Sequence, residues 1–282
     1  MNELQEKQLE ILKEFVRVCE SHHLKYILVG GTMLGAIRHG GFIPWDDDID
    51  VAMPREDYDK YCELQSEYDG TPYFIQTFKS DPHYPYNFAK LRDSSTTFIE
   101  DNFKNHRMNH GVWIDIFPLD GVSKELKEPR KLKNRIMRIW LNFYLCYFPA
   151  LFRKVHKQTF FKDIGLNIVA FLFWWGNIGH YRNKHVEKVV HKLKWDDCKM
   201  VANHFGFNMD REAFDKSYFD ELILVKFEDI MAYIPKRYDE YLKQYYGDYM
   251  TPPPEDKQIG HHYNKGLSLT QGYEDYIKEH KI

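Results

Sequence analysis

Paired cysteines are missing from this chain. It has four cysteines in 282 residues, at Cys19, Cys62, Cys146 and Cys198. This wide spacing matches neither a zinc-binding motif nor a disulfide framework, so we expect a reducing compartment. The first residues carry acidic side chains at helical spacing, which is not the pattern of a secretory signal. We therefore expect a cytoplasmic protein.

A large excess of charge of either sign is also absent. The 39 Lys and Arg residues nearly balance the 42 Asp and Glu residues, for a formal net charge of −3 at pH 7. This balance argues against non-specific nucleic-acid binding, so nucleic acid is not an expected partner. Hydrophobic residues make up 43% of the chain, which is enough to build a core. The length suits one large domain, or one domain with an insertion.

Hydrophobic runs long enough to cross a membrane are absent too. The segments IWLNFYLCYFPALF and IGLNIVAFLFWWGNI lie between basic clusters in residues 130–195, and the second has fifteen uncharged residues. A membrane-spanning helix needs about twenty. Two interpretations fit: ordinary helices of the core, or a helical insertion whose basic and aromatic face rests on a membrane. We expect this insertion at 126–205, between a catalytic core at 1–125 and a segment at 206–282 that completes the catalytic domain.

Periodic apolar residues predict helices and alternating ones predict strands, which together indicate an α/β (α+β) fold with a mixed sheet flanked by helices. We expect a helix at 3–20, a short buried strand at 26–31 that ends in Gly30 and Gly31, and a helix beginning at Thr32. A helix before the proline-rich loop should stop at Gly247. Further strands are expected at 48–53, 73–78, 87–93, 96–100 and 111–121, with 87–93 and 96–100 forming a hairpin around Asp93-Ser94 and the last strand ended by Pro118 and Gly121.

The stretch GGTMLGAIRHGGFIPWDDDIDVAMP, residues 30–54, concentrates four aspartates at one end. Asp48 and Asp50 are two positions apart on a predicted strand, so their side chains point the same way, with Cα atoms roughly 6.5–7 Å apart. Their carboxylates can converge on two divalent ions about 3.5–4 Å apart. Ligand sets made only of oxygen favour Mg²⁺ or Mn²⁺.

A third carboxylate, Asp115, stands between bulky apolar residues in VWIDIF. An aspartate there would be costly to bury without a partner, so we predict that it joins Asp48 and Asp50 as a metal ligand. The alternative is an edge strand on which Asp115 faces water. Asp46 and Asp47 fit a water-mediated metal contact, a solvated turn or a helix-cap role.

The glycine pair suits a phosphate. Gly30 and Gly31 let backbone amides approach an anion closely, and the helix that follows points its positive end at it. Thr32 fits the N-cap position and can donate its hydroxyl to a phosphate oxygen. Arg38 and His39, one helix further on, have the reach to contact the same group.

Other polar residues allow two interpretations each. Lys90 and Arg92 alternate onto one face of a strand, where they could clamp a pyrophosphate or face solvent. Trp45 could stack on a quaternary ammonium group or pack in the core. His261 and His262 follow the proline-rich loop and fit phosphate contacts or surface residues better than metal ligands.

Three stretches, VGGTMLGAIRHGGFIPWDDDIDVAMPREDY, WIDIFPLDG and YLKQYYGDYMTPPP, resemble the LicD family of phosphotransferases. These are bacterial relatives of the fukutin-related proteins, within the polymerase-β-like nucleotidyltransferase superfamily. The resemblance implies transfer of phosphocholine, or a similar phospho-alcohol, from a CDP-linked donor to a sugar hydroxyl of a cell-surface glycan precursor, with release of CMP. It places metal ions at Asp48, Asp50 and Asp115, and donor phosphates at Gly30, Gly31 and Thr32.

The acceptor would belong to teichoic acid, lipopolysaccharide or capsule, and a lipid-linked acceptor would hold the enzyme at the inner face of the cytoplasmic membrane. Within enzymes, the alternatives are transfer of glycerol phosphate or ribitol phosphate, and nucleotidyl transfer from a triphosphate. A membrane adaptor without catalysis is the alternative outside enzymes.

Overall fold

A computed structural model gives the fold of the chain. It describes residues 1–104, 106–122, 183–184, 186–188, 190–191, 194–206, 211–260 and 262–280. Most of the expected insertion at 126–205, with both of its long apolar runs, lies outside the described residues. Among the residues that are described, every helix is too short or too polar to cross a membrane.

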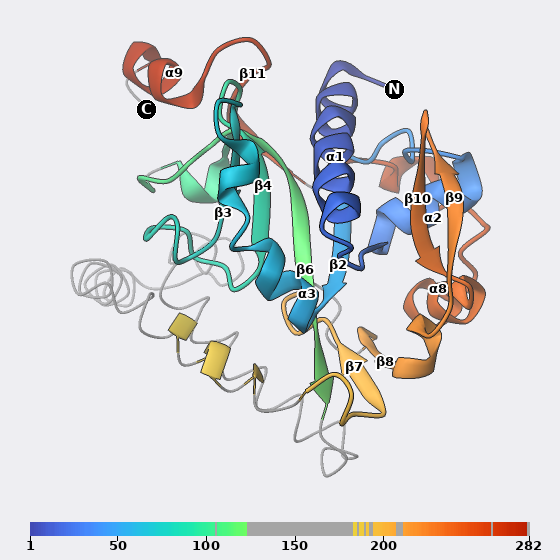
Figure 1. The fold of residues 1–282 in the computed structure, drawn as a ribbon. Helices are drawn as coiled ribbons and strands as arrows, with labels where there is room; N and C mark the ends of the chain where they lie inside the picture. The colour runs from blue at the N-terminus through green and yellow to red at the C-terminus, as the bar shows by residue number, and fades with distance from the viewer. Residues whose placement is uncertain are drawn as a thin grey trace, which may run out of the picture.

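The main sheet is mixed, as the sequence predicts. Its strands follow the order β1-β2-β6-β4-β3, with β7 paired to β6 and β8 to β7 (Figure 1). Strands β2 and β6 are parallel, and the other pairs are antiparallel. The strands are β1 (Ile27–Leu28), β2 (Asp50–Pro54), β3 (Tyr73–Gln76), β4 (Ala89–Asp93), β6 (Val112–Val122), β7 (Met200–Ala202) and β8 (Ala213–Asp215).

Helices α1 (Glu3–Ser21) and α3 (Arg55–Tyr61) cover one face of this sheet (Figure 1). The predicted helix at 3–20 is confirmed as α1, which begins with a capping box between Asn2 and Gln5. Its buried face places Phe15 edge-on to Tyr26 and Tyr61. The core therefore forms between these two helices and the sheet.

Strand β6 continues through Pro118 and Gly121, so the prediction that these residues end it is wrong. The Asp115 amide points at β2, where it donates to the carbonyl of Ile49 (2.8 Å). Backbone amides alternate between the two sides of a strand, so an amide at position 118 would point to the side of β4. The pairing of β4 with β6 ends at Ala89, opposite Ile116, and does not reach Pro118. The missing donor therefore removes no hydrogen bond between these strands.

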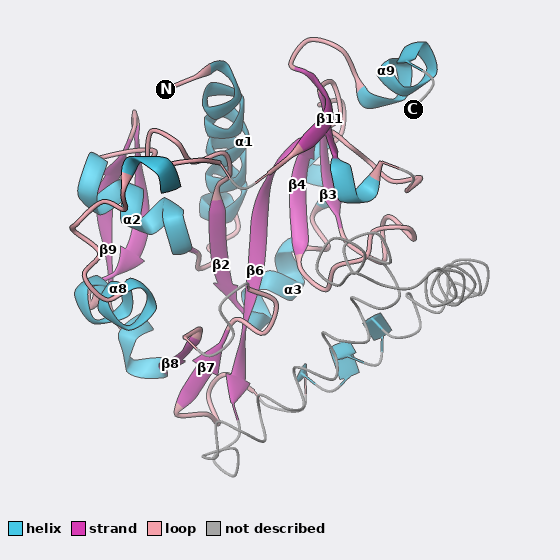
Figure 2. Ribbon diagram, turned by 180° about the vertical axis from the view of Figure 1, so that it is seen from behind, coloured by secondary structure: helices cyan, strands magenta, loops and turns pink. Residues whose placement is uncertain are grey.

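The predicted hairpin around Asp93-Ser94 is also wrong. Strand β5 (Thr97–Glu100) pairs with β11 (Asn264–Ser268) in a separate two-stranded sheet (Figure 2). Strand β4 already has β3 on one side and β6 on the other, so it offers no edge to β5. Strand β11, near the C-terminus, thus pairs with a strand from the N-terminal half of the chain.

The C-terminal hairpin of β9 (Leu222–Phe227) and β10 (Ile230–Pro235) lies beside the β1–β2 edge of the sheet, whereas α9 (Tyr273–His280) lies beside β11 (Figure 1). The hairpin is also next to α2 (Gly30–His39). The helix predicted to stop at Gly247 is confirmed as α8 (Tyr238–Tyr246), since Gly247 adopts φ +75°. The last helix is α9, and the described residues also include the short 3₁₀ helices Gln65–Tyr68, Asp101–Phe103, Lys216–Phe219 and Glu255–Lys257.

Candidate active site

Three carboxylates meet at the centre of the sheet. Asp50 on β2 is in register with Asp115 on the parallel strand β6, and Asp48 lies just before β2. Each of the three offers one carboxylate oxygen, and these oxygens all lie within 4.8 Å of one another. The structure thus brings together the three residues that the sequence pattern singled out.

The electrostatics of this cluster favour a cation. Burial raises the pKa of Asp50 well above its ordinary range, and the neighbouring Asp48 and Asp115 raise it further. Burial also raises the pKa of Asp48. For Asp46, burial and the charge of Asp48 raise the pKa to about 8. Oxygen ligands that repel one another in this way are suited to a divalent cation, which would stabilise their ionised forms.

Helix α2 begins two residues earlier than predicted, at Gly30, so Thr32 is not its N-cap. Gly30 adopts φ +57°, which lets the backbone turn into the helix immediately after Val29. Thr32 is buried instead, and its hydroxyl accepts a hydrogen bond from the backbone amide of Asp50 (2.8 Å). This bond fixes the start of α2 against the start of β2.

The glycine pair is in close contact with the acidic cluster. A Cβ atom on Gly30 would lie 3.0 Å from an oxygen of Asp50, and one on Gly31 would lie 2.7 Å from an oxygen of Asp46. Real Cβ atoms hardly ever approach a neighbour so closely. A side chain at either position would therefore press on a carboxylate of the cluster.

Lys90 supplies positive charge beside Asp115. Its Nζ lies 3.1 Å from Asp115 Oδ1 and 3.8 Å from an oxygen of Glu100. It also lies 3.9 Å from the centre of the Trp113 ring, as a cation–π contact. The Lys90 ammonium thus bridges two carboxylates over an aromatic ring.

Arg92, two residues along β4, is completely buried. Its Nε donates to Gln76, and its Nη1 donates to the carbonyl of Gly111 (2.6 Å). Since Lys90 and Arg92 are both buried, the alternative of a solvated face is wrong. Contact of either residue with a donor phosphate stays a prediction, and Arg92 already holds two partners within the protein.

Arg38 and His39 lie in the last turn of α2. Nη1 of Arg38 donates to the carbonyl of Tyr249 (2.8 Å), which ties α2 to the segment after α8. Trp45 packs partly buried against the core, with its ring edge-on to His39 at 6.4 Å. These contacts support the core-packing interpretation of Trp45.

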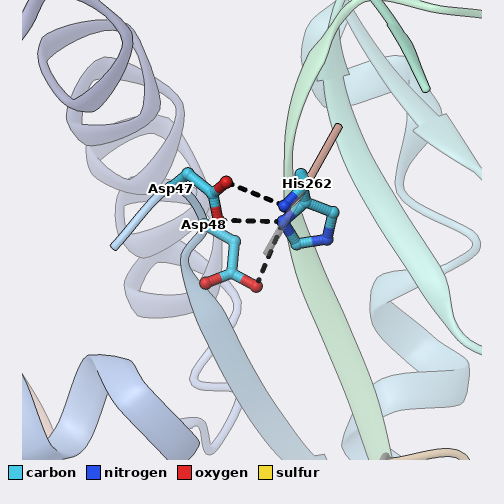
Figure 3. A group of neighbouring side chains, drawn as sticks. All are labelled: Asp47, Asp48 and His262. Carbon is cyan, nitrogen blue, oxygen red and sulfur yellow. Dashed lines mark hydrogen bonds and ion pairs between the residues drawn. The ribbon is translucent and has the colours of Figure 1, made fainter. Parts of the chain in front are cut away.

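His262 reaches the acidic loop from the other end of the chain (Figure 3). Its backbone amide donates to Asp47 Oδ2 (2.8 Å), and its ring Nδ1 lies 3.0 Å from Asp47 Oδ1 and 3.8 Å from Asp48 Oδ2. Burial opposes a charged ring, but the bond to Asp47 and the nearby Asp48 outweigh it and raise the pKa of His262 to about 9. His261 lies outside the described residues.

Four residues of the site were not predicted. Gln5 and Gln8 of α1 donate to the carbonyls of Asp46 (2.9 Å) and Asp47 (2.8 Å), so the helix holds the acidic loop. Two glutamine side chains three positions apart on the apolar side of a predicted helix could have indicated this role. Trp113 lies two positions before Asp115 on β6, and alternation along the strand places both side chains on one face. Glu100, which lies near Lys90 and Arg92, had no comparable indication.

Comparison with known proteins indicates the family of this chain. Residues 23–144 match the family model described as LicD/FKTN/FKRP, nucleotidyltransferase domain. The chain is 33% identical over 272 residues to the lipopolysaccharide cholinephosphotransferase LicD of Haemophilus influenzae, covering 94% of this chain and 98% of that protein. It is 28% identical over 111 residues to the human ribitol 5-phosphate transferase FKRP, covering 38% of this chain and 22% of that protein.

Proposed function

This chain belongs to the LicD family, and from that membership we propose that it transfers phosphocholine, or a similar phospho-alcohol, from a CDP-linked donor to a sugar hydroxyl of a cell-surface glycan precursor. One observation carries the proposal: Asp48, Asp50 and Asp115 converge beside the glycine pair at the start of α2. Carboxylates that can hold divalent cations beside a helix N-terminus suit phosphoryl transfer.

Phosphocholine is the first choice of group. The relative that this chain matches along nearly its whole length is named for choline phosphate and lipopolysaccharide. The relative named for ribitol 5-phosphate matches over 38% of this chain, so ribitol phosphate comes second. Glycerol phosphate, and acceptors in teichoic acid or capsule, belong to the same proposal.

In the proposed reaction, the sugar oxygen forms a bond to the phosphorus that carries the alcohol, and the bond from that phosphorus to the CMP oxygen breaks. The backbone amides of Gly30 and Gly31 would bind the donor phosphates. Asp115, or a water molecule, would accept the proton of the sugar hydroxyl. Mg²⁺ or Mn²⁺, held by Asp48, Asp50 and Asp115, would neutralise the charge that develops on the phosphate and on CMP.

Lys90 would hold Asp115 in place for this reaction, through the contact of 3.1 Å between its Nζ and Asp115 Oδ1. Nucleotidyl transfer uses the same kind of carboxylate set but releases pyrophosphate from a triphosphate. The donor therefore separates the two reactions. If the acceptor is lipid-linked, the enzyme would work as a peripheral protein at the inner face of the cytoplasmic membrane.

A donor panel tests the proposal. The full chain is incubated with Mg²⁺ and CDP-choline, CDP-ribitol, CDP-glycerol or CTP, with and without an envelope glycan acceptor. We expect CMP release and a mass increase of the acceptor with a CDP-alcohol, and neither with Asp48→Asn. Pyrophosphate release from CTP, without turnover of any CDP-alcohol, would overturn the proposal in favour of nucleotidyl transfer.

A further inference from the structure

Asp47, Asp48 and His262 form a second group of ligand-type side chains next to the three carboxylates (Figure 3). The group shares Asp48 with the first set and differs from it in chemistry, because it adds an imidazole nitrogen. Like the first set, it offers one atom from each residue, all within 4.8 Å of one another.

The two distances from the His262 nitrogen to the carboxylates are close to those expected for ligands of a single ion. Two ligand atoms bound to one ion at about 2.0–2.2 Å lie about 2.8–3.6 Å apart for octahedral or tetrahedral angles. His262 Nδ1 lies 3.0 Å from Asp47 Oδ1 and 3.8 Å from Asp48 Oδ2. The first distance falls within that range, and the second needs a shift of a few tenths of an ångström.

The surrounding structure holds these side chains in position. Asp47 uses its other oxygen, Oδ2, to accept the backbone amide of His262 (2.8 Å), which leaves Oδ1 turned to the ring nitrogen. A Cβ atom on Gly260 would lie 2.5 Å from Asp47 Oδ2. Because glycine has no side chain, the segment that carries Gly260 and His262 can approach Asp47 this closely. The His262 ring packs edge-on to Trp113 at 5.4 Å. Hydrogen bonds and packing around the ligating atoms are typical of metal sites.

We propose that Asp47, Asp48 and His262 bind a second divalent ion, and that Asp48 lies between this ion and the one held by Asp50 and Asp115. The inference rests on the proposed function, since it assigns a ligand set to the second ion of a two-metal centre. Imidazole shifts preference from Mg²⁺ towards Mn²⁺, Co²⁺ or Zn²⁺, so the two sites differ in metal preference. The C-terminal segment thereby becomes part of the catalytic centre.

Mn²⁺ is the probe for the test, with the full chain free of any histidine tag. Pulsed electron paramagnetic resonance on the protein with two equivalents of Mn²⁺ should show ¹⁴N modulation from a coordinated imidazole. His262→Gln should abolish that modulation and weaken binding of one Mn²⁺ at least tenfold, with the other within threefold of wild type. The matched control is His22→Gln, because His22 also contacts a carboxylate, Glu67 at 2.9 Å, but on the exposed surface.

Wild-type protein with two bound Mn²⁺ but no nitrogen modulation would overturn the inference, whether or not the variant folds. The inference would also be overturned if His262→Gln binds both Mn²⁺ ions with affinities within threefold of wild type. His262 and Asp47 would then form an ordinary ion pair. Asp50→Asn separates this outcome from failure of the proposed function. If Asp50→Asn leaves Mn²⁺ binding unchanged, the three-carboxylate centre itself is wrong.

Discussion

Asp50 lies directly opposite Asp115 on the neighbouring parallel strand. Asp50 belongs to strand β2 and Asp115 to strand β6. Backbone hydrogen bonds, such as the one that Asp115 N donates to Ile49 O (2.8 Å), fix the register of the two residues along the strands. A site built on paired strands holds its geometry more rigidly than one built on loops. The separation of these two carboxylates is therefore set by the sheet register.

Asp50→Asn and Asp115→Asn should each lower transfer at least about a hundredfold, because each removes an anionic ligand from the metal-binding set. The melting temperature of Asp50→Asn in a chelator should stay unchanged or rise, since the substitution relieves repulsion among neighbouring carboxylates. Asp115→Asn also removes the charge that faces the buried Lys90 at 3.1 Å, so its melting temperature should fall. CMP release and thermal unfolding measure the two effects, with the exposed Asp69→Asn as control. More than a tenth of wild-type activity at saturating Mg²⁺ would contradict the metal assignment. Unfolding of Asp115→Asn would make Asp115 a structural residue.

Gly31→Ala should weaken binding of the CDP-alcohol donor more than it lowers stability. The new Cβ atom would meet Asp46 Oδ2 at 2.7 Å and push this carboxylate within the acidic cluster. The double variant Gly31→Ala, Asp46→Ala removes the clash. Calorimetry with CDP-choline and Mg²⁺ should therefore find the double variant no weaker than Asp46→Ala alone. If the double variant binds much more weakly than Asp46→Ala, the glycine is needed for contact with the phosphate itself.

Sequence reasoning found the part of the site that local patterns encode. Alternation around Asp48 and Asp50, and an isolated Asp115 between apolar neighbours, correctly predicted that these carboxylates would meet. The same reasoning correctly placed α1 and the end of α8 at Gly247. These predictions succeed because strand and helix periods, and the backbone freedom of glycine, act within a few residues.

The parts that sequence reasoning missed depend on contacts between distant segments. His262 and Asp47 were both candidate site residues, but they are 215 positions apart and their pairing was not predicted. The hairpin at Asp93-Ser94 had suitable turn residues, but its first strand was already enclosed by β3 and β6. Likewise, the alternation of Lys90 and Arg92 along a strand would look the same whether that face of the strand is buried or exposed to solvent. Only the tertiary fold distinguishes these cases.

Membrane attachment remains a prediction from residues outside the described part of the chain. Reversing the charges of Arg135, Arg138, Arg153 and Lys154 should reduce sedimentation with anionic vesicles and leave turnover of a soluble acceptor analogue nearly unchanged. Each basic residue near an anionic surface contributes about 1 kcal/mol. High salt should release wild-type protein only in part, because it screens charge but not apolar contact. The control reverses four exposed lysines elsewhere, Lys60, Lys236, Lys243 and Lys278. Equal binding to neutral and anionic vesicles, or none to either, would favour ordinary core helices.

Arg55→Met should lower the free energy of unfolding by about 3–5 kcal/mol. Arg55 on α3 makes two hydrogen bonds to the carboxylate of Asp120 on β6, of 2.6 and 2.9 Å, and both side chains are buried. Removing the guanidinium leaves a buried carboxylate without this partner. Lys60→Met on the same helix breaks an exposed contact with Asp57 and should cost no more than about 1 kcal/mol. Urea unfolding measures both, and equal losses would contradict the distinction between buried and exposed pairs.

The partly buried His106 and the buried His110 should make the protein less stable in acid. Burial, aided by the nearby His110 and His83, lowers the pKa of His106 from 6.5 to about 4. The unfolded chain therefore binds a proton between pH 6.5 and 4 that the folded protein excludes, so the stabilising effect is complete above pH 6.5 and is lost as the pH falls towards 4. One such group changes the free energy of unfolding by at most about 1.4 kcal/mol per pH unit.

His106→Gln should therefore flatten the fall in unfolding free energy between pH 6.5 and 4, as measured by urea unfolding at a series of pH values. Some slope should remain, because burial also lowers the pKa of His110. The exposed His23→Asn is the control, since Asn tolerates the φ of +54° at that position and the slope should not change. The unfolding free energies of His106→Gln and wild type could instead fall with the same slope between pH 6.5 and 4. In that case His106 takes up its proton as readily in the folded protein as in the unfolded chain, and another group causes the acid sensitivity.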